Sequence, residues 1–281
     1  MHKLVKDLVN MGKHPAILTR GYGRRKGPEV LVLLNGNHRW EETGDEAQLL
    51  SSLLPQIPVV ISDDRTLAGQ TAIDKWGANV LVMDDGFQHW PLRRDLDIVC
   101  VDPFEPFGGG LGHLGSFARE RSSALRRAGL ILVTKANLVG PEHLAQLQNR
   151  LASLAKPIPI LPGAYRAVVK SSAEGMPPPD LKGQKVLALS GIGSPESFEF
   201  LLAGLGALVT PARFRDHHLY TQGEIENIVK KARKENLVVI TTMKDAMRVP
   251  APHHFSTLHI ELDLGEGEAL WRSTLLSVRR P

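Results

Sequence analysis

The sequence contains a single cysteine and no long apolar run. Because Cys100 has no second cysteine among the 281 residues, a disulfide within the chain and a cysteine-based zinc cluster are both excluded. No stretch approaches the roughly 18 consecutive apolar residues that a membrane-spanning helix needs. These absences favour a protein of the reducing cytoplasm.

Charge of one sign is not concentrated in any segment either. The 34 Lys and Arg residues are scattered among 30 acidic residues, which gives a formal net charge of +4 and a sequence pI of about 9.2. This distribution is compatible with a phosphate-bearing or acidic partner. Hydrophobic residues make up 42% of the chain, enough for one large core or two smaller ones, and we expect two domains.

Short apolar runs alternate with helical patterns over residues 1–155. Strands that are apolar on both faces are typical of a parallel sheet covered by helices, so this segment is predicted to form an α/β domain. The predicted strands are residues 15–19, 30–34, 57–62, 79–84, 97–102 and 130–135. The predicted helices are residues 46–54, 64–77 and 141–155, and the spacing of Leu4, Val5, Leu8 and Val9 predicts an amphipathic helix before them.

The pattern changes over residues 156–183, which are rich in proline and have no sustained period. We interpret this segment as a linker with one or two short strands. Residues 184–281 are predicted to form a second, smaller α/β domain. It contains strands near 185–193 and 237–242 and helices near 194–206, 221–236 and 266–278.

Two adjacent carboxylates end the stretch "NVLVMDD", residues 79–85. Asp84 and Asp85 are thus placed at the carboxyl end of a predicted strand, where open parallel sheets bind ligands. Two such close carboxylates repel each other unless a cation is shared or one is protonated, and Mg²⁺ is often held this way in nucleotide enzymes. The alternative is a solvated turn, since Asp-Asp-Gly is also common in turns.

Other polar groups accompany predicted element ends. "LTRGYGRR" places arginines among glycines after a strand, which suits an anionic ligand. Asp45 in "GDEA" stands at a helix start, where a helix cap is the simpler interpretation. "RFRDHHLY" brings Asp216, His217 and His218 together, a pattern that on its own is more often found on surfaces than in catalytic sites.

These motifs together resemble those of the tetraacyldisaccharide 4′-kinase family of the lipid A pathway. "RGYG", "GDE", "DDGFQH", "GIGSPESF", "DHH" and "TTMKDAMR" occur in the family's order, from about Lys3 to beyond Arg248. The resemblance implies a P-loop-kinase-like parallel sheet with helices on both faces. It also implies transfer of the γ-phosphoryl group of ATP, with Mg²⁺, to the 4′-hydroxyl of a lipid disaccharide 1-phosphate. This would take place at the inner face of the cytoplasmic membrane, with no nucleic-acid partner.

The resemblance also implies residue roles. Asp84 and Asp85 match the acids that hold Mg²⁺, and Gln88 matches a residue of the same nucleotide-binding loop. Asp45 matches the candidate base for the sugar hydroxyl, and His217 matches the histidine that works with it. The positions that match the substrate or phosphate site are Arg20, Tyr22, Arg65, His89, Arg119 and Glu120.

The phosphate-binding loop itself is missing from the sequence. No G-x-x-x-x-G-K-[ST] string occurs, and "NMGKHP" fails because His14 replaces the hydroxyl residue. In the family this loop precedes "RGYG" by one helix, which is here the first helix. We therefore expect that the chain is truncated and that, as given, it binds Mg-ATP poorly; a remnant without catalysis is the competing explanation.

Two other functions stay open from the sequence. The first is a non-catalytic protein that binds the lipid disaccharide without ATP. The second is a metal-dependent hydrolase, and its candidate ligands are Asp84, Asp85, Asp216, His217 and His218. We further expect closure of the two domains to bring His217 to Asp45, and an exposed apolar face of the first helix to offer a membrane-binding surface. The oligomeric state stays open.

Overall fold

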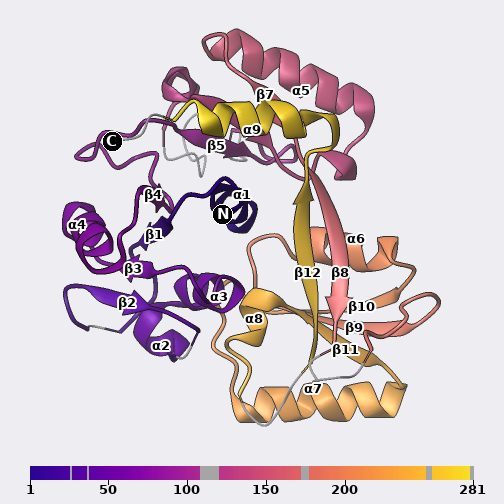
Figure 1. The fold of residues 1–281 in the computed structure, drawn as a ribbon. Helices are drawn as coiled ribbons and strands as arrows, with labels where there is room; N and C mark the ends of the chain where they lie inside the picture. Colours follow the sequence, from indigo (N-terminus) through magenta and orange to yellow (C-terminus); the bar gives the residue numbers. More distant parts are fainter. Residues whose placement is uncertain (26, 37, 108–119, 172–176, 251–254, 279–281) are drawn as a thin grey trace.

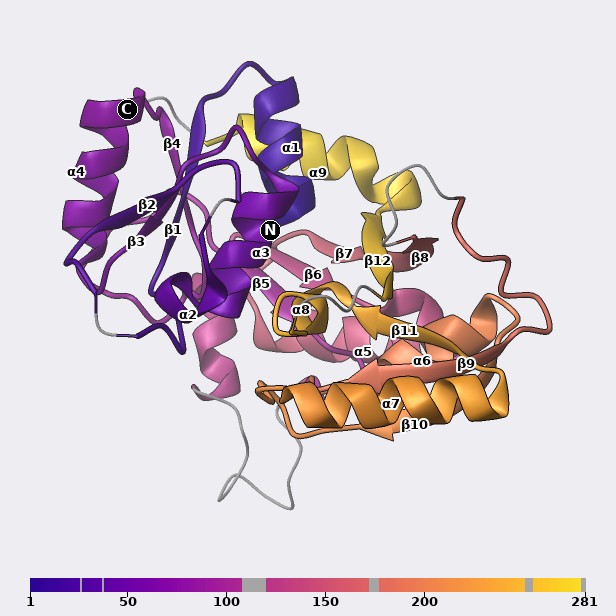
Figure 2. The same ribbon diagram turned by 90° about the horizontal axis from the view of Figure 1, so that it is seen from below.

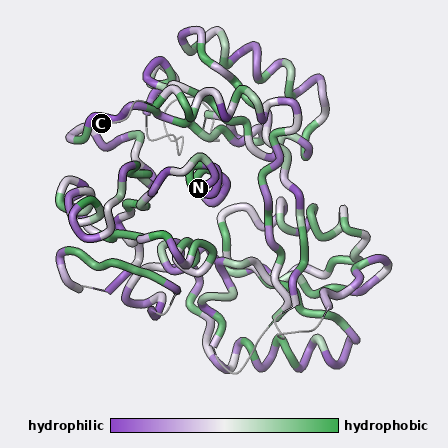
Figure 3. Tube along the Cα trace, in the orientation of Figure 1, coloured by the Kyte–Doolittle hydropathy of each residue, from purple (hydrophilic) through white to green (hydrophobic). Residues whose placement is uncertain are grey.

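Three β-sheets with helices on their faces organise the part of the chain that the structure describes (Figure 1). This computed structural model describes residues 1–25, 27–36, 38–107, 120–171, 177–250 and 255–278. Hydrophobic residues gather along the strands and on the inward faces of the helices (Figure 3). No helix in these ranges combines the length and the apolar character needed to cross a membrane.

The N-terminal sheet has the strand order β2-β3-β1-β4, in which β2 alone runs antiparallel to its neighbour. Helix α4 covers one face through Ala68 and Ala72, whereas α1 and α3 cover the other (Figure 2). The strands are β1 (Pro15–Thr19), β2 (Leu31–Leu33), β3 (Val59–Ile61) and β4 (Val80–Met83). The helices are α1 (His2–Asn10), α2 (Trp40–Thr43), α3 (Asp45–Leu53) and α4 (Arg65–Trp76).

The apolar side of α1 is directed inward. Val5 and Leu8 are 0% and 4% exposed and pack against β1 and β3. Hydrophobic burial of this face anchors the helix on the sheet. The expectation that this face is exposed is therefore wrong, although Val9 does face solvent.

The middle sheet consists of three parallel strands in the order β5-β6-β7. Helix α5 packs on one face through Leu147 and Leu151, and α9, the last helix of the chain, covers the other face through Trp271 and Leu275. The strands are β5 (Ile98–Val101), β6 (Leu130–Val133) and β7 (Ile160–Pro162). The helical segments are η1 (Ser122–Arg127), η2 (Ala136–Leu138), α5 (Pro141–Leu154) and α9 (Glu268–Leu276).

The C-terminal sheet has the order β10-β9-β11-β12-β8, with β8 antiparallel to β12. Helices α6 and α7 lie on opposite faces of this sheet. The strands are β8 (Ala164–Lys170), β9 (Lys185–Ser190), β10 (Leu208–Arg213), β11 (Val238–Thr242) and β12 (Ser256–Asp263). The helical segments are α6 (Pro195–Gly204), α7 (Gln222–Glu235), α8 (Met243–Ala246) and η3 (Gly265–Gly267).

The predicted α/β architecture is confirmed, with differences in detail. The strands of residues 1–155 belong to two sheets, and β2 is antiparallel. The segment predicted as a linker contains β7 and β8, which pair into different sheets. Strands β10 and β12 were not predicted, and α9 returns to the middle sheet. The domain boundaries at 155 and 183 stay predictions.

A cleft of about 2120 Å³ separates the N-terminal sheet from the middle sheet. Its walls are the facing edges of β4 and β5, and Leu4 and Leu8 of α1 also line it. Within the described residues, β4 pairs on one side with β1, and β5 pairs on one side with β6. Each strand therefore presents a free edge to the cleft, and such an edge can accept another strand.

We predict that Gly44→Ala destabilises the fold because Gly44 lies directly before α3 with φ 86° and ψ 146°. A Cβ there would stand 2.5 Å from the carbonyl oxygen of Tyr22, so the backbone of this turn would have to shift. We expect a loss of about 1–3 kcal/mol in the free energy of unfolding, measured by chemical denaturation.

Gly77→Ala is the matched control. Gly77 also has a positive φ, 63°, but a Cβ there meets nothing within 4 Å. The loss in the free energy of unfolding for Gly77→Ala should come only from the left-handed backbone conformation, about 1 kcal/mol. Equal losses for the two variants would contradict the contact that we assign to Gly44.

Candidate active site

Asp45 is the first residue of α3, and its carboxylate is almost enclosed, with 4% of the residue exposed. Its Oδ1 accepts a hydrogen bond of 2.9 Å from the backbone amide of Glu46. A buried carboxylate is costly unless other groups compensate its charge. The compensating groups come from the far end of the sequence.

His217 provides the first of these groups, from the loop that follows β10. Its Nδ1 lies 3.0 Å from Oδ2 of Asp45, although 172 positions separate the two residues. His217 has φ 57°, and the edge of its ring meets the exposed Tyr22 ring at a centroid distance of 5.5 Å. A second contact between the same two parts of the molecule joins Lys244 Nζ to Glu46 Oε1 at 3.0 Å. The expected approach of His217 to Asp45 is thus present in the structure.

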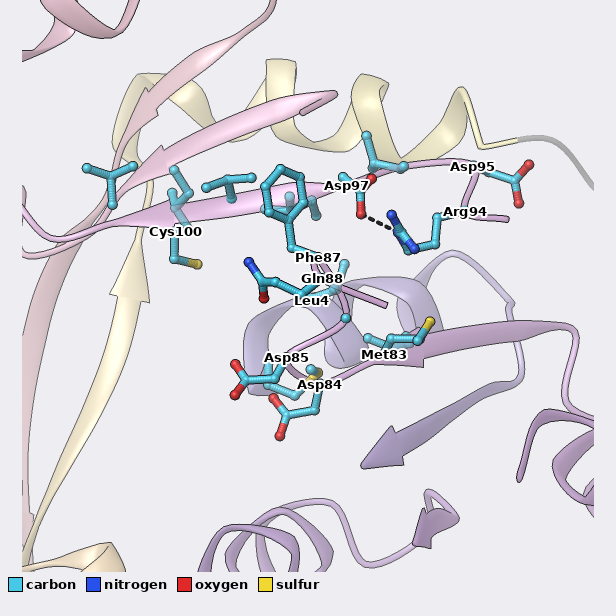
Figure 4. Close-up of a pocket in the computed structure, with 18 of the residues that line it drawn as sticks. Leu4, Met83, Asp84, Asp85, Phe87, Gln88, Arg94, Asp95, Asp97 and Cys100 are labelled. Carbon is cyan, nitrogen blue, oxygen red and sulfur yellow. Dashed lines mark hydrogen bonds and ion pairs between the residues drawn. The ribbon is translucent and has the colours of Figure 1, made fainter. Parts of the chain in front are cut away.

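Asp84 and Asp85 follow β4, and their carboxylates lie side by side at the border of the cleft (Figure 4). The amide of Asp84 donates to the carbonyl of Leu18, and its Oδ2 accepts a 3.4 Å hydrogen bond from the hydroxyl of Thr19. Burial, together with repulsion from Asp85 and Glu46, raises the pKa of Asp84. The carboxylate pair therefore carries negative charge that a cation would stabilise.

Positive groups adjoin these acids. Arg65, the first residue of α4, is 3% exposed, and its Nη1 donates to the carbonyl of Ser62 at 2.6 Å. Burial lowers the pKa of Arg65, and repulsion by Arg20 adds to this effect. Burial followed by repulsion from Arg65 and Arg20 also lowers the pKa of His89. The structure thus gathers Arg20 and Arg65 into one electropositive group, with His89 beside it.

Sequence analysis missed Arg127, which organises the loop after Asp85. Its guanidinium carbon stands 4.4 Å from the centroids of both the Phe87 and Trp90 rings, and its Nη1 forms an ion pair of 2.8 Å with Glu120. The hydrogen bond from Arg127, supported by one with Gln88, lowers the pKa of Glu120. The string "ALRRA" at residues 124–128, which also occurs in the order of the family's motifs, was the available signal for Arg127.

The remaining predicted residues are Arg119, Asp216 and His218. Arg119 lies outside the described residues. His218 contacts Glu224 at 3.2 Å, and Asp216 accepts the amide of His217. In the described ranges, no three or more His, Cys, Asp or Glu side chains form a group that could hold a metal ion.

Comparisons with known proteins agree on one family. A family model described as tetraacyldisaccharide-1-P 4′-kinase matches residues 1–278. The tetraacyldisaccharide 4′-kinase of Anaeromyxobacter sp. (strain K) is 39% identical over 259 residues, which are 87% of this chain and 66% of that protein. The protein of the same name from Anaeromyxobacter sp. (strain Fw109-5) is 36% identical over 93% of this chain and 73% of its own length.

A solved structure extends the agreement to the fold. The crystal structure of LpxK from Aquifex aeolicus in complex with ATP matches with a TM-score of 0.74 and 27% identity, over 99% of this chain and 82% of that chain. The chain thus spans just under two thirds of the length of the strain K relative and most of the solved LpxK chain.

We predict that a carbodiimide reagent joins Glu46 to Lys244 in the folded protein, because their charged atoms lie 3.0 Å apart. Mass spectrometry of a proteolytic digest would identify the resulting amide. The Lys3–Glu268 pair, at 2.9 Å, serves as an internal control for the reagent, and Glu46→Gln should remove only the first crosslink. If Lys3–Glu268 reacts and Glu46–Lys244 does not, the two parts of the molecule do not meet in this way.

Proposed function

The chain belongs to the tetraacyldisaccharide-1-P 4′-kinase family, and from this premise we propose that it carries the acceptor and metal sites of a lipid kinase. The reaction is transfer of the γ-phosphoryl group of ATP to the 4′-hydroxyl of a tetraacyldisaccharide 1-phosphate. The observation that carries the proposal is the 3.0 Å contact between Asp45 and His217. An enclosed carboxylate oriented by an imidazole is a suitable base for a sugar hydroxyl.

In this reaction Asp45 takes the proton of the 4′-hydroxyl as the oxygen forms its bond to phosphorus and the bond to the ADP oxygen breaks. His217 holds the carboxylate in place through Oδ2. Phosphoryl transfer depends mainly on positioning and on neutralising charge, so the enzyme needs positive groups near the phosphates. Arg20 and Arg65 supply such groups. His89 lies beside them, and its Nε2 is enclosed without a hydrogen-bond partner in the described residues.

Mg²⁺ is the cofactor that the donor atoms at the end of β4 would suit. Asp84, Asp85 and the hydroxyl of Thr19 are all oxygen donors, and burial followed by repulsion from Asp85 and Glu46 raises the pKa of Asp84. When bound, the ion would neutralise charge on the phosphates. Gln88 lines the same cleft and completes the proposed nucleotide side of the site.

The kinase proposal also requires a phosphate-binding loop, and the 281 residues contain no G-x-x-x-x-G-K-[ST] string. The cleft between β4 and β5 is a suitable place for it, since both strands present free edges within the described residues. A strand in this cleft would bring the loop after it close to Asp84 and Asp85. Without that loop, we expect the 281-residue polypeptide to bind Mg-ATP weakly.

A second candidate function follows from the same missing motif. The polypeptide would bind the lipid disaccharide through the electropositive group and Asp45 but would not transfer phosphate. Contact with the inner membrane surface belongs to both proposals, because the acceptor is a lipid. ATP binding and turnover distinguish the two candidates.

The phosphate-binding loop can be tested by fusion. We predict that joining a strand and a G-x-x-x-x-G-K-[ST] loop ahead of α1 increases the affinity for Mg-ATP at least ~10-fold over the 281-residue polypeptide, measured by calorimetry. The control is the same fusion with the loop lysine changed to alanine. A gain of affinity in the control as well, or in neither protein, would contradict the proposed place of the loop.

In this fusion protein, we predict that Asp45→Asn lowers kcat by ~10²–10⁴ with little change in KM for the lipid disaccharide, because it removes the proton acceptor and retains the shape. Transfer of labelled phosphate from ATP to the disaccharide measures the effect. Asp74→Asn on the exposed face of α4 is the matched control and should retain full activity. An Asp45→Asn variant as active as its parent would exclude Asp45 as the base. Disaccharide binding without transfer by the parent fusion would favour the second candidate.

A further inference from the structure

Two cationic side chains, Lys244 and Arg248, contact the Asp45–His217 pair from the short segment that follows β11. Lys244 lies in α8, and Arg248 follows one turn later, so the two side chains project to the same side. Both belong to "TTMKDAMR", to which no role has been assigned above. Lys244 meets the imidazole, and Arg248 meets the carboxylate.

The contact of Lys244 determines which nitrogen of His217 carries the ring proton. Lys244 Nζ lies 3.1 Å from Nε2 of His217 and is held by Glu46 at 3.0 Å. Because an ammonium group can only donate hydrogen bonds, Nε2 must accept. Nδ1 therefore carries the proton of the neutral ring and donates to Oδ2 of Asp45. The other charged group near Nε2 is Asp216, whose Oδ1 lies 3.9 Å away.

Arg248 approaches the same carboxylate from inside the fold. Its side chain is 1% exposed, and Nη1 lies 3.6 Å from Oδ2 of Asp45. Nη1 and Nε have no hydrogen-bond partner in the described residues, whereas Nη2 donates to Asp245 and to the carbonyl of Gly191. A buried guanidinium group needs opposite charge around it, and Asp45 and Asp245 supply that charge.

Asp245 holds Arg248 in this orientation. Asp245 is fully buried and accepts hydrogen bonds from the Tyr220 hydroxyl at 3.0 Å and the Thr242 hydroxyl at 2.6 Å. Its Oδ1 also accepts the amide of Gly191 at 3.1 Å and contacts Arg248 at 2.6 Å. With so many donors fixed to one carboxylate, the guanidinium group has little freedom to turn away from Asp45.

We propose that Lys244 and Arg248 are positioning residues for the base of the kinase reaction, an inference that rests on the function proposed above. Lys244 fixes the tautomer of His217, and Arg248 fixes the direction of Oδ2 of Asp45. Oδ2 is then occupied by His217 and Arg248. Oδ1, which among the described contacts accepts only the amide of Glu46, is left to take the proton of the acceptor hydroxyl.

The kinetic test uses Lys244→Met in the fusion protein. We expect kcat to fall roughly 10- to 100-fold with KM for both substrates nearly unchanged, as for other side chains that orient a catalytic histidine. In an Asp45→Asn background the same substitution should have no further effect, because the group that it positions is gone. Lys231→Met on the exposed face of α7 is the matched control. A Lys244→Met variant with the kcat of its parent would overturn the role of Lys244.

Arg248 requires a variant that tolerates its buried position. Arg248→Met leaves Asp245 buried without its cation, so thermal unfolding must first show that the protein is folded. Arg248→Lys keeps the charge but cannot form the same two-pronged contact, and its kcat should lie between those of Arg248→Met and the parent. Equal kcat values for all three folded proteins would overturn the role of Arg248.

A measurement independent of catalysis uses the 281-residue polypeptide itself. The ¹⁵N chemical shifts of the His217 ring distinguish the two neutral tautomers. We expect a single Nδ1–H form in the parent and a mixture in Lys244→Met. If the ¹⁵N shifts of the His217 ring are the same in Lys244→Met as in the parent, the inference is overturned even if the kinase reaction is found. If Lys244→Met changes the tautomer of His217 but the fusion protein transfers no phosphate, the proposed function is refuted and the contact between Lys244 and His217 is retained.

Discussion

The contact between Asp45 and His217 depends on how the C-terminal sheet is joined to the rest of the molecule. The chain passes into that sheet from β7 to β8 and returns from β12 to α9, and β8 and β12 pair with each other along the way (Figure 1). The connection therefore consists of two strands that are hydrogen-bonded to each other. Because paired strands resist independent motion, the loop that carries His217 is held opposite α3.

Charge explains why these residues can stay close together. Each buried acid near the proposed catalytic base has its own cation or hydrogen-bond donor. Asp245 is paired with Arg248, and Asp45 is paired with His217. At the end of β4 the balance differs, because Arg65 donates to a backbone carbonyl and the pKa of Asp84 stays raised. Around Asp45, the described residues therefore supply a partner for each buried acid, whereas Asp84 and Asp85 are suited to an added cation.

Local patterns in the sequence were sufficient to predict many of the strands and helices. Strands such as β1 and β6 are buried on both faces and show as continuous apolar runs, whereas β10 lies at a sheet edge with alternating exposure and gives a weak signal. The acids at the end of β4 were predictable from their position. The contacts of Lys244 with Glu46 and of Arg248 with Asp45 were not, because they join residues about 200 positions apart, and no local pattern encodes such pairing.

The same contacts that organise the base also hold the two parts of the molecule together. Lys244 with Glu46, and Arg248 and His217 with Asp45, all cross from the C-terminal sheet to α3. Any opening of this interface would remove the tautomer-setting donor, the guanidinium group and the imidazole from the carboxylate at once. Asp45 would then lose the charged groups that compensate its carboxylate, an unfavourable state that hydration would have to relieve. Base assembly and contact between the two parts are therefore one equilibrium, and a ligand that favours contact also favours the assembled base.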